Sequence, residues 1–71
     1  MIIKDVAIDK EVKVKVYTKH NVRFNEIKEA LLNNPLLRKT KDGRYIAINN
    51  VGRRLTVIFS CIDGIADIVT A

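Results

Sequence analysis

Apolar residues recur at helical spacing between positions 24 and 33. Phe24, Ile27, Ala30 and Leu31 fall on one face of a helix, while the charged residues between them fall on other faces. Asparagine and glutamate stand near the start of this segment, and an Asn-Asn-Pro sequence follows it, where the residue before proline avoids helical geometry. The pattern predicts a helix over residues 24–33 with one face against a core.

After residue 35 the chain changes to short apolar runs separated by turn-forming residues. Three turn signals are present, at Asp42-Gly43, at residues 49–52 and at Asp63-Gly64. They leave four segments rich in β-branched and aromatic residues, which we expect to form an antiparallel sheet. The predicted strands are residues 36–41, 44–48, 53–62 and 65–70.

The third predicted strand has the clearest alternation. Leu55, Val57, Phe59 and Cys61 share one face, and the opposite face is more mixed. We therefore expect this strand to be central in the sheet, with Cys61 buried as a small apolar residue.

Residues 9–20 are ambiguous. Val12, Val14 and Val16 alternate with lysines as in a strand, yet Ile8, Val12, Val16 and His20 also recur at helical spacing. Periodicity alone favours a strand.

Length and composition indicate a single small domain, residues 1–71. A chain of 71 residues with 48% apolar residues is globular, although it is short for a stable core. Thirteen Lys and Arg against eight Asp and Glu give a net charge of +5, which favours an anionic partner, with nucleic acid first and an acidic protein second. The alternative is that the charge serves only solubility.

Several classes of chemistry lack their sequence signals. The single cysteine excludes an internal disulfide and a multi-cysteine metal site, and it fits a reducing compartment. No signal-peptide core, membrane-length apolar run, glycine-rich phosphate loop, metal-ligand spacing or dinucleotide fingerprint is found. We expect a cytoplasmic protein with no membrane contact, no metal and no small-molecule cofactor.

His20 is the only histidine, and Lys19 and Arg23 flank it. In RNA cleavage without a metal, the 2′-hydroxyl attacks the adjacent phosphate, so the site must accept one proton, donate another and neutralise charge on the phosphate. A histidine between cations supplies those roles, since its ordinary pKa lies near neutrality. The alternative is that His20 ends one element and hydrogen-bonds backbone carbonyls in the turn.

A second group of cations follows the predicted strands and gives this part of the sheet a positive bias that suits RNA phosphates. Its members are Arg38, Lys39, Lys41, Arg44, Arg53 and Arg54. Arg44 with Tyr45 pairs a guanidinium with a phenol that can stack on a base or protonate a leaving group. Regular alternation keeps these two side chains off a common strand face, and protection of sheet edges is the competing explanation for the charges.

The chain contains five short motifs, which are Lys19-His20-Asn21-Val22, then Phe24 with the helix ending Ala30-Leu31, then Asp42-Gly43-Arg44-Tyr45, then Gly52 to Phe59, and finally Ile68 to Ala71. In this order and spacing, they give the chain a resemblance to the BrnT family of small toxins from type II toxin-antitoxin modules. The resemblance implies a RelE-like α+β fold, with two N-terminal helices packed on the four-stranded antiparallel sheet. A short N-terminal strand over residues 2–7 is a further option. In this family a lysine-histidine pair closes the first helix, so the resemblance makes residues 9–20 helical.

The resemblance also implies a metal-independent endoribonuclease that cleaves RNA and is neutralised by a cognate antitoxin protein. Carried over residue by residue, His20, Arg44 and Tyr45 become the candidate catalytic residues. Lys19, Arg23, Arg38, Arg53 and Arg54 become the candidate RNA phosphate-binding residues. Family members usually continue after the last strand with an arginine and a helix, so a shortened member is expected. Asn21 replaces the usual glycine, and Arg23 replaces a small capping hydroxyl.

A second hypothesis is a non-catalytic RelE-like interaction module that binds RNA or a protein partner. A homodimer is a further option, since it would cover apolar surface left bare in a shortened domain.

Overall fold

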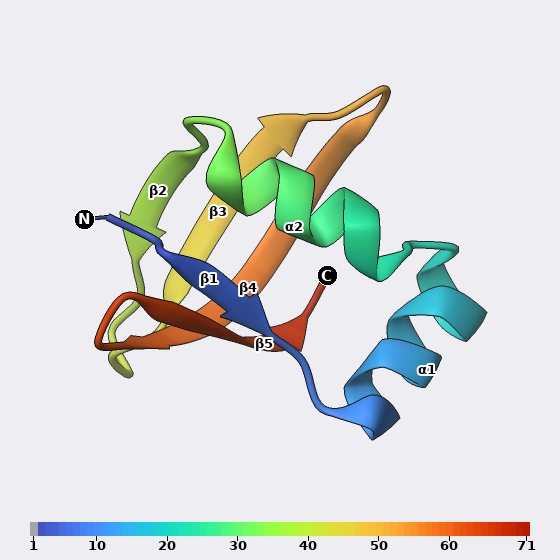
Figure 1. The fold of residues 1–71 in the computed structure, drawn as a ribbon, viewed down its shortest axis with the longest axis horizontal. Helices are drawn as coiled ribbons and strands as arrows, with labels where there is room; N and C mark the ends of the chain where they lie inside the picture. Colours follow the sequence, from blue (N-terminus) through green and yellow to red (C-terminus); the bar gives the residue numbers. More distant parts are fainter. Residues whose placement is uncertain (1) are drawn as a thin grey trace.

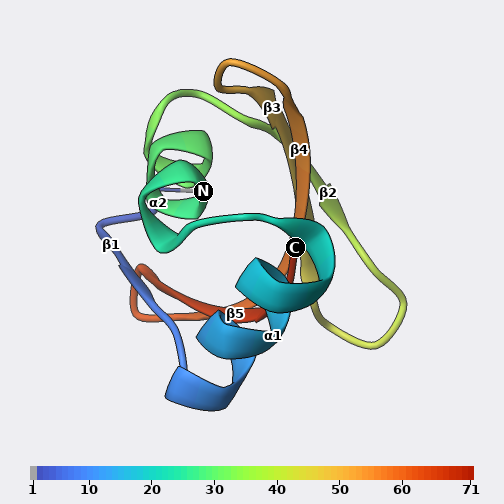
Figure 2. The same cartoon turned by 90° about the vertical axis from the view of Figure 1, so that its right-hand side faces the viewer.

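The computed structural model describes residues 2–71, which form two helices and one five-stranded sheet. The order along the chain is β1 (Asp5–Ala7), α1 (Lys10–His20), α2 (Phe24–Leu32), β2 (Leu36–Lys39), β3 (Tyr45–Asn50), β4 (Arg54–Ile62) and β5 (Ile65–Thr70). In the sheet the order is β1-β5-β4-β3-β2. Figure 1 shows α2 lying across β3 and β4, and Figure 2 shows α2 to one side of these two strands. The first helix, α1, packs against β5.

The general α+β class is confirmed, and the prediction of four antiparallel strands is corrected to five strands in a mixed sheet. The four later strands pair in antiparallel fashion. The additional strand, β1, falls within residues 2–7 and pairs in parallel with β5, placing Val6 opposite Ala66. The carbonyl of Gly64 accepts the N–H of Lys4 at 2.7 Å, which aligns the N-terminal segment with the edge of β5.

The central strand is β4, as its alternation predicted. Leu55, Val57 and Phe59 are buried in the core against the helices, and Cys61 is partly buried. The ring of Tyr45 on β3 stacks on Phe59 with 5.6 Å between ring centroids. The core therefore lies between this face of the sheet and the two helices.

Residues 10–20 form a helix, so the strand favoured by period-two alternation was wrong. Val16 is only 2% exposed, whereas Val14 is 57% exposed, as expected when the buried positions follow helical spacing. The helix ends because Asn21 adopts a left-handed conformation, with φ 53°. The N–H groups of Asn21 and Val22 then bond to the carbonyls of Tyr17 and Val16.

The second helix matches its prediction except at its last residue. It buries Ile27, Ala30 and Leu31 and ends at Leu32. Asn49 on β3 caps this end, because its side-chain amide donates to the carbonyls of Ala30 and Asn33. No helix within residues 2–71 is long and apolar enough to cross a membrane.

Candidate functional site

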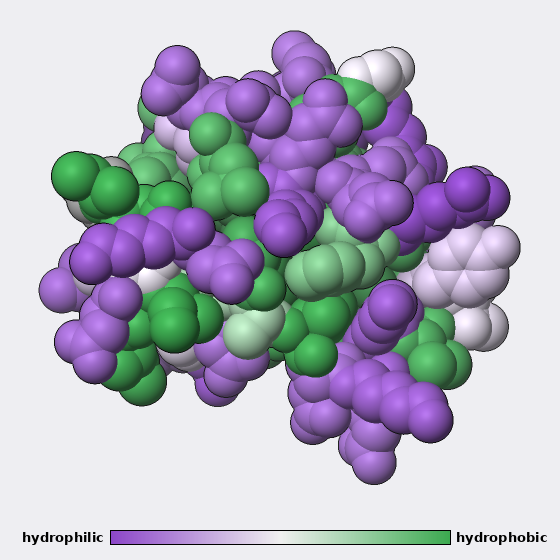
Figure 3. Space-filling model, viewed as in Figure 1, coloured by the Kyte–Doolittle hydropathy of each residue, from purple (hydrophilic) through white to green (hydrophobic). Residues whose placement is uncertain are grey.

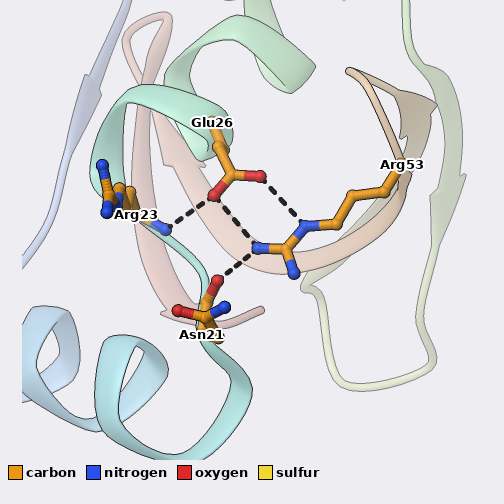
Figure 4. Close-up of polar contacts among 4 residues, drawn as sticks. All are labelled: Asn21, Arg23, Glu26 and Arg53. Carbon is orange, nitrogen blue, oxygen red and sulfur yellow. Dashed lines mark hydrogen bonds and ion pairs between the residues drawn. The ribbon is translucent and has the colours of Figure 1, made fainter.

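A guanidinium from the turn before β4 holds the link between the two helices. Arg53, in the turn before β4, donates from Nε and Nη2 to the two carboxylate oxygens of Glu26, at 3.0 Å each. Nη2 also donates to the backbone carbonyl of Asn21 (Figure 4). The N–H of Arg23 donates to Oε1 of Glu26 at 3.2 Å. We call this set of Asn21, Arg23, Glu26 and Arg53 the junction clamp.

The junction clamp gives Arg53 an internal partner. The predicted role for Arg53 was phosphate binding, but its guanidinium neutralises a carboxylate of its own chain. The hydrogen bond from Arg53, followed by that from the Arg23 N–H, holds the pKa of Glu26 below its ordinary value. Glu26 therefore stays ionised and paired at neutral pH.

A shallow hollow of about 270 Å³ opens beside the clamp, between α1 and the start of α2. Two cations lie over two aromatic rings there. Lys13 Nζ is 5.7 Å from the centroid of Phe24, and the guanidinium carbon of Arg23 is 6.0 Å from the centroid of Tyr17. We call this the junction hollow; its lining is Lys13, Tyr17, Val22, Arg23, Phe24 and Asn25.

The electrostatics and shape of the junction hollow suit an anion that also carries a flat ring. Tyr17 is 51% exposed, so part of its ring surface is open to solvent. Neither Lys13 nor Arg23 forms an ion pair with a carboxylate in residues 2–71. In Figure 3, apolar surface emerges between the hydrophilic side chains that cover α2 and those that cover α1.

His20 is the last residue of α1 and is exposed. Lys13, Tyr17 and His20 follow spacings of four and three, which place them along one side of the helix. The turn after His20 is closed by backbone N–H groups, and the imidazole makes no hydrogen bond with residues 2–71. Its side chain is therefore free at the end of the helix face that borders the junction hollow.

Arg44 and Tyr45 lie elsewhere. The turn of residues 40–44 is on the opposite side of the molecule from the end of α1 (Figure 1). Arg44 lies 3.7 Å from Asp42 in an ion pair, and the ring of Tyr45 is half-buried against Phe59. The candidate catalytic residues therefore do not form one site. His20 lies at the end of α1, and Arg44 and Tyr45 lie at the turn between β2 and β3.

The remaining predicted phosphate-binding residues divide in the same way. Lys19 and Arg23 belong to the segment around the junction, and both are exposed. Arg38 lies opposite Ile46, and Arg54 lies opposite Asn50. Because the side chains of alternate residues point to opposite faces, Arg38 and Arg54 lie on the sheet face away from the helices.

Sequence reasoning missed Lys13 and Tyr17. The sequence signal for them is the spacing of residues 13, 17 and 20. This spacing places the three side chains along one side of a helix, so it is informative only when residues 10–20 are assigned to a helix. Phe24 was identified only as a residue of the core-facing stripe, yet it also lines the junction hollow.

Comparisons with protein-family models, curated proteins and solved structures found no match to this chain. Among residues 2–71 no group of three His, Cys, Asp or Glu side chains is placed to hold a metal ion.

Proposed function

We propose that this protein is a BrnT-like toxin of a type II toxin-antitoxin system, with a RelE-like fold, that cleaves RNA in the cytoplasm without a metal ion. The observation that carries the proposal is the position of His20. This exposed imidazole ends the helix side that also presents Lys13 and Tyr17 to the junction hollow. This position supports the proposal because a histidine and two cations belong to neighbouring parts of the same helix junction.

The proposed reaction uses the RNA's own 2′-hydroxyl as the nucleophile. In the proposed step, the imidazole of His20 takes the proton of the hydroxyl as the 2′-oxygen forms a bond to phosphorus. The bond from phosphorus to the 5′-oxygen breaks, and that oxygen leaves with the proton returned by the imidazolium. The products are a 2′,3′-cyclic phosphate and a 5′-hydroxyl. Arg23 and Lys13 stabilise the negative charge that builds on the phosphate oxygens.

The family resemblance supports a second partner besides RNA, namely a cognate antitoxin protein that neutralises the toxin. A homodimer is the alternative protein partner under this proposal. Copurification of a small protein encoded in the adjacent reading frame is the expected result. Light scattering on the isolated chain measures whether the chain alone is monomeric or dimeric.

Cleavage of a labelled single-stranded RNA in the presence of EDTA tests the activity. We expect cyclic-phosphate ends, and a rate that falls about 10²- to 10⁴-fold in His20→Ala. Tyr45→Phe is the matched control for the other candidate region, because it keeps the ring that stacks on Phe59 and removes only the hydroxyl. Intact RNA with the unaltered protein would contradict the ribonuclease proposal. A His20→Ala variant with full activity would contradict the role of His20.

A non-catalytic RNA-binding module is the second candidate. The observation in its favour is the separation of the end of α1 from the turn that carries Arg44. This candidate predicts that RNA binds and stays intact, and that affinity falls steeply as salt rises.

A further inference from the structure

The junction hollow contains two aromatic rings, and it also offers two kinds of hydrogen-bond donor. The first kind is the pair of cations, Lys13 and Arg23. The second is the backbone N–H groups of Phe24 and Asn25 in the first turn of α2, where a helix has no internal acceptors. Within residues 2–71 neither N–H has a hydrogen-bond partner, whereas those of Arg23 and Glu26 do.

The junction clamp makes this region favourable for an anion. Glu26 is the acidic residue nearest the start of α2, and its charge is neutralised by Arg53. The same clamp holds the backbone at Asn21 and Arg23, so the link between the helices is fixed from both sides (Figure 4). The guanidinium of Arg23 stays outside the clamp and lies over Tyr17.

We propose that the junction hollow is a subsite for one nucleotide of single-stranded RNA. The base stacks on the exposed ring of Tyr17 or on Phe24, and an adjacent phosphate accepts hydrogen bonds from Arg23, Lys13 and the N–H groups at the start of α2. This inference rests on the proposed function for its choice of RNA as the ligand.

The volume of the junction hollow and its exposed aromatic ring favour single-stranded RNA over a duplex. At about 270 Å³ the hollow is below the usual range for drug-sized ligands, roughly 300 to 1,000 Å³, so it accommodates one small group. Bases within a duplex are stacked on each other, and their faces are not available to a protein ring. A single strand presents a free base face beside each phosphate.

Binding of a short fluorescein-labelled RNA tests the subsite, with 2′-O-methyl groups to block cleavage. Tyr17→Ala is expected to weaken binding about 5- to 150-fold, as loss of one stacked base does. Arg23→Gln is expected to reduce the slope of log affinity against log salt by about 0.7, as loss of one phosphate contact does for a single strand. Lys15→Gln is the matched control, because it removes one exposed cation of α1 that does not line the junction hollow, and Arg38→Gln tests the far face of the sheet.

The outcomes separate the subsite from the proposed activity. RNA binding that is unchanged in Tyr17→Ala and Arg23→Gln but weakened in Arg38→Gln overturns the subsite and leaves RNA as the ligand. Binding that depends on Tyr17 and Arg23, with unmodified RNA left intact, supports the subsite and refutes the endoribonuclease. A duplex of the same sequence that binds as tightly as the single strand overturns the preference for a free base. Absence of binding to the 2′-O-methyl RNA overturns the subsite. The endoribonuclease proposal is tested separately, by cleavage of unmodified RNA.

Discussion

Asn49 connects β3 to the end of α2, and its replacement by aspartate tests how strongly this connection stabilises the fold. Its Nδ2 donates to the carbonyl of Ala30 at 3.0 Å and to that of Asn33 at 2.9 Å. Its Oδ1 accepts the N–H of Asn50 at 2.8 Å. Asn49→Asp keeps the shape of the side chain and the acceptor, and it replaces the donor with a second oxygen.

The expected loss follows from the two hydrogen bonds. Each contributes about 0.5 to 1.5 kcal/mol, so their removal costs about 1 to 3 kcal/mol. Two carbonyl oxygens facing a carboxylate add repulsion, which places the loss in the upper part of this range at neutral pH. A domain of 71 residues has a free energy of unfolding of about 4 to 11 kcal/mol at the usual value per residue. The change thus removes a large fraction of the stability.

Urea unfolding followed by circular dichroism measures the loss. Asn50→Asp is the matched control, because it makes the same charge change at the next residue, which is exposed and on the other face of β3. We expect the control to be as stable as the unaltered protein or up to about 1 kcal/mol more stable, because the new carboxylate faces Arg54 across the strand pair. Equal unfolding midpoints for the two variants would show that the bonds of Asn49 to α2 do not stabilise the fold.

Three further changes test other parts of the structure. Because the pKa of Glu26 is lowered, chiefly by Arg53, its contribution is present above its ordinary pKa and is lost as pH falls through the folded value. Glu26→Gln should therefore flatten the acid side of the thermal-stability profile, and identical profiles would contradict this. Asn21→Ala should cost about 1 kcal/mol because alanine is strained at φ 53°, while Asn21→Gly should cost less in the same urea titration. Phe59→Ala, at a fully buried position, should cost about 3 to 5 kcal/mol in the same urea titration, and a loss below about 1 kcal/mol would argue against the assigned core.

The elements fixed by local chemistry were predictable from the sequence. Gly43 and Gly64 adopt φ values of 85° and 80°, which is why the turn signals located these two turns correctly. The bounds of the strands beside Gly43 differ from the prediction, because residues 36–41 pair only as Leu36–Lys39 and residues 44–48 shift to Tyr45–Asn50. Residues 65–70 form a strand with the predicted bounds. In α2 the apolar spacing gave the correct buried face because three of its four stripe positions are buried.

The failures come from contacts between residues distant in the chain. Nothing local to Asp5–Ala7 encodes its parallel pairing with β5, about 60 residues later. Valines at every second position satisfy strand alternation, and only packing against the core distinguishes buried Val16 from exposed Val14. The pairing of Arg53 with Glu26 was missed for the same reason, since Glu26 is 27 residues earlier in the chain.

Under the proposed function, the distribution of the cations gives them different roles toward RNA. Arg38 and Arg54 lie on the sheet face away from the helices, and neither makes a cation–π contact within residues 2–71. The attraction that this proposal gives them for RNA is therefore general, and it is screened over about 10 Å at 0.1 M salt. Lys13 and Arg23 each lie over a ring. Stacking strength, unlike charge attraction, depends on whether a base face is free. The far-face arginines should consequently change the rate of RNA association, and discrimination between single strands and duplexes should depend on the junction hollow.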